Sequence, residues 1–569
     1  MNSQPDLTPQ KETKYTVPIL FLFLILNAFK ITFVYYIFNI DQNYLPYHYV
    51  ASLLIDCIIF YLTLRFSKAY FFIIAYLIQF AYLTINLSYF IYFDSFIHVN
   101  YYYYLFQEYF ELAENFSMPI NPKILNLLID LPCVICILIL YHTVHKSINR
   151  LNVYRKKIFI YVISTLFMIY AMIYAVHYSS TKYPLNDFTV VEDYGMLAHN
   201  VVDLLKTRTP LEEVAQISYA RKFALSYGKK ISKKGTGSNR ANIIMLQVES
   251  LDANIIDATY KGEYVTPFLH WLSTKSIFYP YTLSYHTAGG SSDCDISVIN
   301  SIEPLHDFPT MGLSNYSYPN SMVKQLSKQS YGVFAFHGNT GSFYKRSKNF
   351  KHMGFDMFYD ISEMGLKEEG WGASDKDVFT YVLNELQSAK KPFFYYVITM
   401  SSHEPFKNVT RYYHNVLFDE VRPALTRDYF NSMSYVDTVL KDFVSAVRNT
   451  SKNAYIFIYG DHTPYLINKG SYKRAFAEIE DNGFEFVPLF IVTPDEKVFY
   501  EKSKVASFLD LAPTVLFVTG LSFKIRSDGI NLLETPITDA EIPYKGTLYS
   551  RELLFNFASS VRKNNGGAH

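Results

Sequence analysis

Cysteine is scarce in this chain of 569 residues, which contains only four. Three of them, Cys57, Cys133 and Cys136, fall inside long apolar runs, so Cys294 is the only one in the polar remainder. An intramolecular disulfide is therefore excluded there, and that part must be held together by its own hydrophobic core. The charges nearly cancel, with a formal net charge of +1, so the charge balance gives no reason to expect nucleic acid as a partner.

Long apolar runs, in contrast, fill the first third of the chain. Each is close to the ~20 residues that a helix needs to cross a bilayer, and an odd number of spans places the two ends of the chain on opposite sides. A cleaved signal peptide would explain the first run alone, but no small-residue cleavage pattern follows it. The five runs are residues 17–40, 48–64, 69–93, 124–141 and 158–177.

The short connections between these runs alternate in charge. Because basic loops stay in the cytoplasm, we expect a cytoplasmic amino terminus and an extracytoplasmic location for everything after about residue 177. The basic connections hold Arg65, Lys68, Lys146, Arg150, Arg155, Lys156 and Lys157, and the acidic ones hold Asp41, Asp94, Glu108, Glu111 and Glu114.

Composition along the chain predicts five parts. The basic stretch of small residues before residue 240 marks the start of the large outer domain. The parts are a cytoplasmic tail (1–16), a five-helix transmembrane domain (17–178), a connector (179–239), an extracytoplasmic domain (240–560) and a tail (561–569).

Two charged residues, Lys30 and Asp56, lie inside the first and second apolar runs. A charge in lipid is costly and usually pairs with another or lines a polar groove. We expect these two to pair with each other, and a role in handling lipid or glycan is the alternative.

Four segments of the outer part have the continuous apolar pattern of strands buried on both faces. Each is followed by polar side chains, and the carboxyl ends of strands in α/β sheets are where ligands collect. Helical patterns between them complete an α/β sheet covered on both faces. The strands are 241–248, 331–336, 393–399 and 454–459; the residues that follow are Glu249, His337, His403, Asp461 and His462; the helices include 376–388 and 432–446.

A fifth element is the sequence Gly-Gly-Ser-Ser-Asp-Cys-Asp at residues 289–295, with a helical pattern after it. Two glycines allow close approach of the backbone to a ligand, and a helix start offers N–H groups to an anion. Alone, such a turn is a helix cap as often as a nucleophile site. Together with carboxylates and histidines at strand ends, it suggests a hydroxyl activated by a metal ion.

In this order the motifs resemble those of lipoteichoic acid synthases and related phosphoglycerol transferases, within the sulfatase and alkaline phosphatase superfamily. The resemblance extends over nearly the whole chain, the five apolar runs included, and implies a catalytic α/β domain with a central mixed sheet and helices on both faces. The motifs are Gln247–Ser250, Gly290–Asp293, His337–Asn339, Phe343–Arg346, His403–Phe406, Gly460–His462 and Phe508–Thr514.

The resemblance also implies a metal site and a nucleophile. The family's Mn²⁺ or Mg²⁺ ligands correspond here to Glu249, Ser291, Asp461 and His462, a donor set that suits such an ion. The family's nucleophile is usually a threonine, and Ser291 stands at that position. Its neighbour Ser292 remains an alternative, although the spacing to the following aspartate favours Ser291.

Substrate contacts carried over from the family fall on His337, Tyr344, Arg346 and His403, with His403 also the preferred proton carrier. The family has tryptophan where this chain has Tyr344 and aspartate where it has Asn339. Both changes border the headgroup pocket.

The function implied is transfer of phosphoglycerol, or a related headgroup, from a phospholipid such as phosphatidylglycerol to a surface polymer, glycolipid or glycan through a phospho-serine. The setting implied is a bacterial plasma membrane, with a multi-pass anchor. A phosphodiesterase using water is the enzymatic alternative, and a non-catalytic polymer-binding protein is the other. Cys294 lacks the context of an arylsulfatase formylglycine, and phosphoethanolamine transferases of lipid A carry several outer-domain disulfides, which this chain cannot form.

Overall fold

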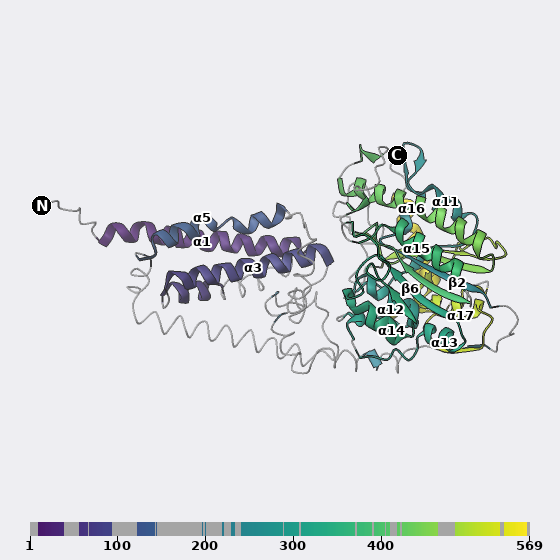
Figure 1. The fold of residues 1–569 in the computed structure, drawn as a ribbon. Coiled ribbons are helices and arrows are strands. Elements are labelled where there is room, and N and C mark those ends of the chain that lie inside the picture. The colour runs from purple at the N-terminus through teal and green to yellow at the C-terminus, as the bar shows by residue number, and fades with distance from the viewer. Residues whose placement is uncertain are drawn as a thin grey trace. The chain divides into compact units, whose positions relative to one another are not determined.

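In the computed structural model the chain forms two compact units, residues Met1–Thr209 and Pro210–His569. Figure 1 shows the helices of the first unit and the layered second unit. The structure describes residues 9–38, 56–65, 68–93, 122–142, 144, 196, 200, 219–220, 229–233, 240–287, 289–305, 309–313, 315–369, 372–389, 392–403, 406–409, 418–421, 424–464, 484–534 and 540–565.

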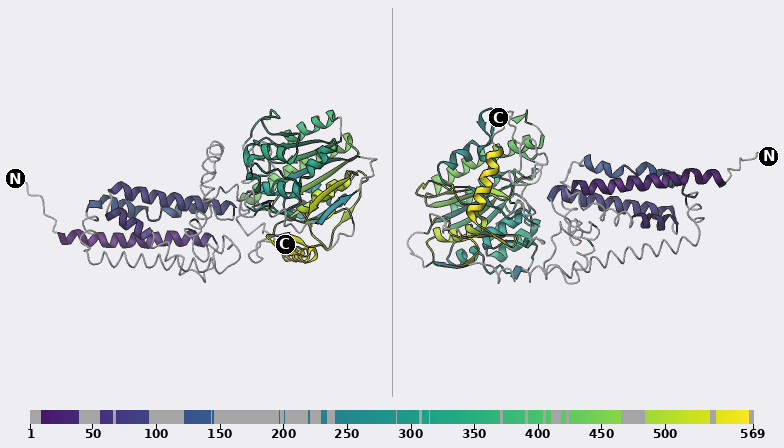
Figure 2. Two further views of the ribbon diagram at one scale, coloured as in Figure 1. Left: turned by 90° about the horizontal axis from the view of Figure 1, so that it is seen from below. Right: turned by 180° about the vertical axis from the view of Figure 1, so that it is seen from behind.

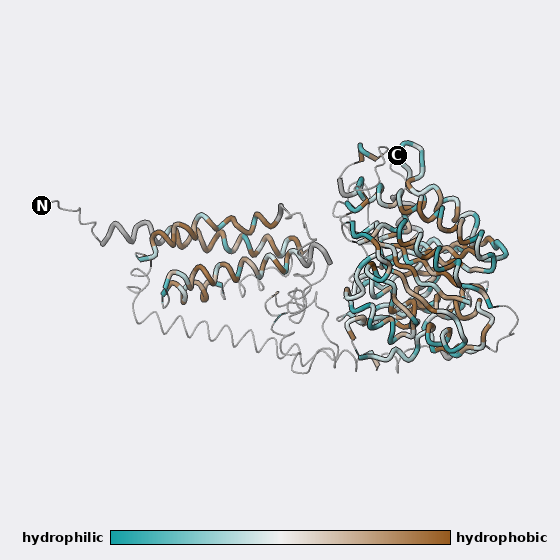
Figure 3. Tube along the Cα trace, viewed as in Figure 1, coloured by the Kyte–Doolittle hydropathy of each residue, from teal (hydrophilic) through white to brown (hydrophobic). Residues whose placement is uncertain are grey.

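The first unit contains apolar helices. These are α1 (Pro9–Ile37), a helix at 56–65, α3 (Ala69–Phe93), the 3₁₀ helix η2 (Pro122–Leu128) and α5 (Leu131–Ile139). Figure 3 shows how apolar residues dominate these helices. In the described part, two helices are long and apolar enough to cross a membrane, at Pro18–Ile37 and Ala69–Ser88. The fifth predicted run, 158–177, lies outside the described residues, so the five-helix bundle stays a prediction.

A buried polar cluster joins the helices of the first unit, and it corrects the predicted pairing of Lys30 with Asp56. Lys30 Nζ lies 2.6 Å from Asp130 Oδ2, and both side chains are fully buried. Gln79 links this ion pair to Asp56, because its Oε1 accepts from Lys30 at 2.9 Å and its Nε2 donates to Asp56 at 2.7 Å. Tyr76 donates to the second Asp130 oxygen. Asp130 lies inside the fourth predicted run, 124–141, and was missed because only Lys30 and Asp56 were singled out as charges within the runs.

We expect Lys30→Met and Asp130→Asn each to destabilise the first unit, since removing one partner of a buried ion pair costs about 3–5 kcal/mol. The double variant Lys30→Met/Asp130→Leu should recover most of the loss, and Asp56→Asn, which keeps an acceptor for Gln79, should have a small effect. Thermal unfolding of the full chain in detergent, followed by helical circular dichroism, measures this. Unchanged midpoints in both single variants would contradict it.

The second unit is built around a mixed sheet of nine strands, in the order β11-β5-β10-β9-β2-β8-β6-β7, with β12 also paired to β5. Strand β10 runs antiparallel to both of its neighbours, β5 and β9, and the other described strand pairs of this sheet are parallel. The four predicted buried strands are confirmed and adjacent. The strands are β2 (Asn242–Val248), β5 (Ile277–Leu283), β6 (Gly332–His337), β7 (Met357–Tyr359), β8 (Phe393–Ile398), β9 (Ala454–Gly460), β10 (Phe486–Val492), β11 (Phe499–Tyr500) and β12 (Ala506–Ser507).

Helices cover both faces of this sheet, as predicted (Figures 1 and 2). Strand β2 shows why: Ile243 and Met245 belong to one apolar core, and Ile244 and Leu246 belong to the other. The first core is covered by α12 (Ser291–Asn300), α13 (Met322–Lys328), α14 (Arg346–Met353), α17 (Leu511–Val518) and α18 (Arg551–Asn565). The second is covered by α11 (Pro267–Ser273), α15 (Asp375–Ser388) and α16 (Ala424–Thr450).

Small elements complete the unit. Residues 229–233, within the predicted connector, form β1, which pairs antiparallel with β13 (Phe523–Ser527). The others are η3 (Ala253–Asp257), the pair β3 (Thr259–Tyr260) and β4 (Glu263–Tyr264), η4 (Thr310–Gly312), η5 (Phe343–Lys345), η8 (Phe508–Asp510), and the pair β14 (Ile542–Tyr544) and β15 (Thr547–Tyr549).

Candidate active site

The site forms where four neighbouring parallel strands end in one row. The register pairs His337 of β6 with Ile398 of β8, Ile398 with Gln247 of β2, and Gln247 with Tyr459 of β9. The residues immediately past this row therefore gather at one edge of the sheet, although they come from distant parts of the chain. Shared strand direction is the physical reason that the predicted residues meet.

Glu249, Asp461 and His462 form a buried cluster, with one ligand-type atom from each lying within 4.8 Å of the others. Glu249 Oε1 is 3.0 Å and Asp461 Oδ1 is 3.7 Å from His462 Nε2. The ring nitrogen Nδ1 lies 2.9 Å from the Thr463 carbonyl. A carbonyl can only accept, so Nδ1 carries a proton, and Nε2 is the ring atom that faces the two carboxylates.

The two buried carboxylates of this cluster would be stabilised by a bound cation. Burial and then the adjacent Glu249 raise the pKa of Asp461 well above its usual value. Burial opposes a charge on His462, but Asp461 and Glu249 raise its pKa above the usual value. Asp461 Oδ2 is buried and has no hydrogen-bond partner among the described residues. Two carboxylates, an imidazole and a nearby hydroxyl are ligands that Mn²⁺ and Mg²⁺ accept, so these residues fit the expected ion.

Ser291, the first residue of α12, joins this cluster and its neighbour does not. Ser291 Oγ is 3.3 Å from Glu249 Oε2 and 3.3 Å from His462 Nε2. Ser292 is fully buried and its hydroxyl donates to the Gly289 carbonyl at 2.7 Å. Of the two hydroxyls that the sequence left open, the structure brings only that of Ser291 to the carboxylates.

The turn before Ser291 is organised by Asp293. Its Oδ2 accepts hydrogen bonds from Thr287 N, Thr287 Oγ1 and Gly289 N. A Cβ at Gly289 would lie 2.2 Å from the Asp293 carboxylate, and Gly290 has φ +54 and faces the Tyr344 hydroxyl. Gly289 is therefore required by its close approach to Asp293 and Gly290 by its positive φ, whereas the sequence had predicted that the two glycines allow close approach to a ligand.

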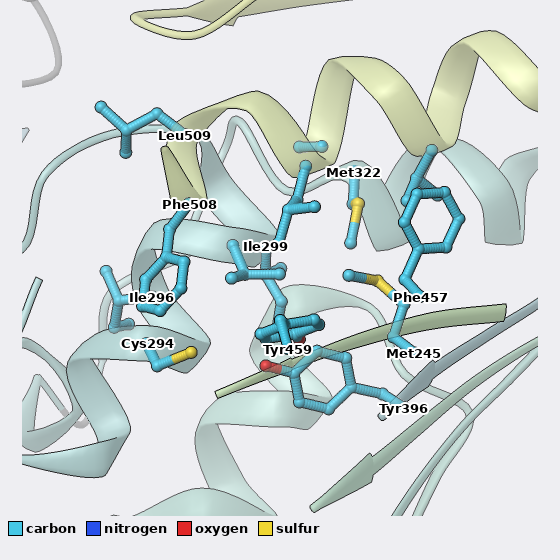
Figure 4. Packing of buried hydrophobic residues seen from close by; sticks show 14 of the residues in the cluster. Met245, Cys294, Ile296, Ile299, Met322, Tyr396, Phe457, Tyr459, Phe508 and Leu509 are labelled. Atoms are coloured by element: carbon cyan, nitrogen blue, oxygen red, sulfur yellow. The ribbon is translucent and has the colours of Figure 1, made fainter. Parts of the chain in front are cut away.

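The opposite side of α12 is anchored in the core. Figure 4 shows Cys294, Ile296 and Ile299 packed among the buried residues around Phe508 and Tyr459. Burial raises the pKa of the Cys294 thiol well above its usual value, so this cysteine is an inert part of the packing. The helix thereby holds Ser291 at a fixed height above the sheet.

Arg346 extends into the site as a buried cation, and one nitrogen of its guanidinium has no hydrogen-bond partner in the described part of the chain. Its Nε donates to Asp295 at 2.9 Å, and its Nη1 is 3.1 Å from His337 Nε2. Its Nη2 is buried and has no hydrogen-bond partner among the described residues. Burial and the nearby guanidinium lower the pKa of His337 to about 3, so this imidazole is neutral and accepts from Arg346. The open N–H of a guanidinium suits a phosphoryl oxygen.

Tyr344 and His403 border the same region. Tyr344 has φ +53, an uncommon backbone conformation for this residue type, and its ring lies 5.5 Å from Arg346 Cζ. His403 is half-buried on the turn after β8 and lies within electrostatic reach of Glu249 and His337. The turn is held by Asp375, whose carboxylate accepts from the N–H groups of Met400 and Ser401.

Several residues at this site carried no usable sequence signal. Asp295 was part of a noted motif but had no assigned role, whereas Asp375 stands at the start of a helix, where acidic residues are common. His286 and Glu485 lie near strand ends of the antiparallel part of the sheet; His286 stacks on His462, with ring centroids 4.4 Å apart. Single histidine and glutamate residues near strand ends are common in proteins, so the sequence offered no reason to assign a function to these two.

The second unit is similar to a known family. Residues 241–521 match the family described as Sulfatase. The chain is 30% identical over 341 residues to lipoteichoic acid synthase 1 of Bacillus subtilis, covering 55% of this chain and 50% of that protein. It is 26% identical over 357 residues to the lipoteichoic acid synthase of Staphylococcus saprophyticus, covering 59% and 53%.

A solved structure extends the likeness of fold beyond residues 241–521. The integral membrane protein lipooligosaccharide phosphoethanolamine transferase A from Neisseria meningitidis matches with a TM-score of 0.51 at 13% identity, covering 88% of this chain and 95% of that one. The chain spans about half the length of the two curated synthases.

Proposed function

We propose that the chain is a membrane-anchored, metal-dependent transferase. It would move phosphoglycerol, or a related phospho-headgroup, from a phospholipid such as phosphatidylglycerol to a surface polymer, glycolipid or glycan through a phospho-serine on Ser291. One observation carries the proposal: the Ser291 hydroxyl lies 3.3 Å from both Glu249 and His462, beside Asp461. The names of the curated relatives support this reaction class.

Glu249, Ser291, Asp461 and His462 would hold one Mn²⁺ or Mg²⁺ ion. Such an ion supplies Lewis acidity, which lowers the pKa of the serine hydroxyl and offsets charge on the phosphoryl group. The Glu249 and Asp461 carboxylates would face the ion, and His462, whose Nδ1 lies on the Thr463 carbonyl, would offer Nε2 to the ion with release of the Nε2 proton. The ionised Ser291 Oγ attacks phosphorus, and the bond from phosphorus to the diacylglycerol oxygen breaks.

The remaining residues stabilise charge and move protons. Arg346 directs its open Nη2–H at a phosphoryl oxygen, and His337 and Asp295 hold the guanidinium in place. His403 donates a proton to the departing diacylglycerol oxygen and then takes one from the acceptor hydroxyl, which displaces Ser291 Oγ from phosphorus. Tyr344 borders the headgroup.

The membrane location is part of the same proposal. Large apolar side chains of the first unit are exposed, among them Phe21 at 63% and Ile78 at 63%, as expected of helices that face lipid. We propose the five-span topology, the domain boundaries and the cytoplasmic amino terminus that the sequence predicts, with the catalytic domain on the outer face of a bacterial plasma membrane. There the lipid donor is already concentrated.

The test uses the purified protein in liposomes of phosphatidylglycerol that is labelled in its headgroup glycerol. We expect Mn²⁺-dependent release of diacylglycerol, and we expect label to remain on the protein after a rapid acid quench. Label that then moves to an added glycolipid supports transfer, whereas label found only as free glycerol phosphate supports the phosphodiesterase alternative. Phosphatidylethanolamine liposomes serve as the headgroup control. Metal-loaded protein that releases no diacylglycerol from any phospholipid would refute the proposal.

A further inference from the structure

His462 lies against a second histidine that has no role in the proposed reaction. The His286 and His462 rings are nearly parallel, with an interplanar angle of 16° and a centroid separation of 4.4 Å. The His286 side chain is only 8% exposed. A ring packed flat on another restricts its rotation, because tilting either ring would bring it into its neighbour.

Glu485 fixes the stacked ring and the chain after His462 at the same time. Its Oε1 is 3.2 Å from His286 Nδ1, and its Oε2 accepts from the Thr463 N–H at 2.9 Å. Thr463 in turn offers its carbonyl to His462 Nδ1. One carboxylate therefore holds the ring that covers His462 and the residue whose carbonyl selects its tautomer.

The sheet places this pair. Phe486 of β10 is in register with Leu283 of β5, and Ser284 N donates to Glu485 O at 3.0 Å. Glu485 precedes β10 and His286 follows β5, so antiparallel pairing brings the two residues together. The pair is thus built on β5 and β10, and β10 in turn pairs with β9, the strand that leads to Asp461.

We propose that His286 and Glu485 are positioning residues that set the affinity of the cation site by fixing the plane and tautomer of His462. The inference rests on the proposed metal-dependent function and adds to it a determinant of ion binding. The His462 Nε2 atom lies 3.0 Å from Glu249 and 3.3 Å from Ser291. A small rotation of the His462 ring would therefore move Nε2 away from the point where these residues would bind the ion together. Partners that orient metal-ligating histidines typically change affinity by about 10–100-fold when removed.

The test is Mn²⁺ binding to the full-length protein in detergent, with free Mn²⁺ followed by its room-temperature electron paramagnetic resonance signal. His286→Ala should raise the Kd by about 10–100-fold. His286→Phe keeps a flat ring and should recover most of the affinity. Glu485→Gln keeps an acceptor for Thr463 N–H, so its Kd should lie between that of the wild type and that of His286→Ala.

The chain offers a matched control in His270. This histidine also stacks on an aromatic ring, that of Tyr264 at 3.7 Å, and contacts a carboxylate, Asp257 at 3.0 Å. His270→Ala should leave the Kd unchanged. Melting of the metal-free variants by tryptophan fluorescence identifies any loss of folding. Where His286→Ala unfolds, Glu485→Gln takes its place, and wild-type Mn²⁺ affinity in folded Glu485→Gln would then overturn the inference.

Wild-type Mn²⁺ affinity in folded His286→Ala, or equally weak binding by folded His286→Ala and His286→Phe, would overturn the inference while leaving the proposed function intact. Failure of the wild-type protein to bind Mn²⁺ would overturn both. A weakened His286→Ala that is rescued by the phenylalanine variant, with His270→Ala unaffected, is the result that the geometry requires.

Discussion

Ser291→Ala should abolish headgroup transfer, by a factor of about 10⁴ or more, while leaving the protein folded. Nucleophile deletion removes the covalent route entirely and leaves only residual catalysis from binding and electrostatics. The side chain is half-buried and its two hydroxyl contacts are long, at 3.3 Å, so its loss creates little cavity. Diacylglycerol release from phosphatidylglycerol liposomes and the acid-stable label on the protein are the two measurements.

Two neighbouring substitutions make this result specific. Ser291→Thr keeps a hydroxyl in the same place and should retain transfer, in keeping with the threonine usual in the resembled family. Ser292→Ala removes the buried hydrogen bond to Gly289 and should lower stability modestly with turnover largely preserved. Transfer at the wild-type rate by Ser291→Ala, or its loss in a folded Ser292→Ala alone, would reassign the nucleophile.

Arg551→Ala should destabilise the second unit by about 3–5 kcal/mol, the usual cost of leaving a buried charge without its partner. Arg551 and Asp510 are fully buried and form a bidentate pair, with both N–O distances 2.8 Å. Arg551 also donates to the carbonyls of Val505 and Ala540. The pair therefore ties the last helix, α18, to the segment that leads into α17.

The whole chain can be used for this measurement. Its two tryptophans, Trp271 and Trp371, both belong to the second unit, so urea unfolding followed by tryptophan fluorescence reports on that unit. Lys497→Ala is the matched control, because its contact with Asp495 is exposed (68% and 55%) and such pairs contribute about 0–1 kcal/mol. Equal unfolding midpoints for Arg551→Ala and Lys497→Ala would contradict the expectation.

The role of Asp510 explains a motif whose function the sequence did not define. Phe508–Thr514 was one of the segments that carried the family resemblance. In the structure Asp510 accepts from Ser507 N in a capping box and from Ile530 N, and it pairs with Arg551. This motif stabilises the fold, and its acidic residue is a structural anchor.

The sequence by itself determined the elements and their chemistry. Continuous apolar runs identified β2, β6, β8 and β9, because strands buried on both faces admit few polar residues. The same pattern indicated which residues follow each strand, and parallel strands end at one edge. The family resemblance, in contrast, was needed to narrow the candidate nucleophile to the two adjacent serines Ser291 and Ser292.

Only the tertiary structure decided which of those side chains touch. Consecutive residues on a helix point about 100° apart, so Ser291 faces the carboxylates while Ser292 faces Gly289. Lys30 meets Asp130 rather than Asp56, and His286 meets Glu485 from 199 residues away. Such contacts depend on strand register and helix packing, which arise from the summed burial of many side chains, and no local pattern encodes a partner that far along the chain.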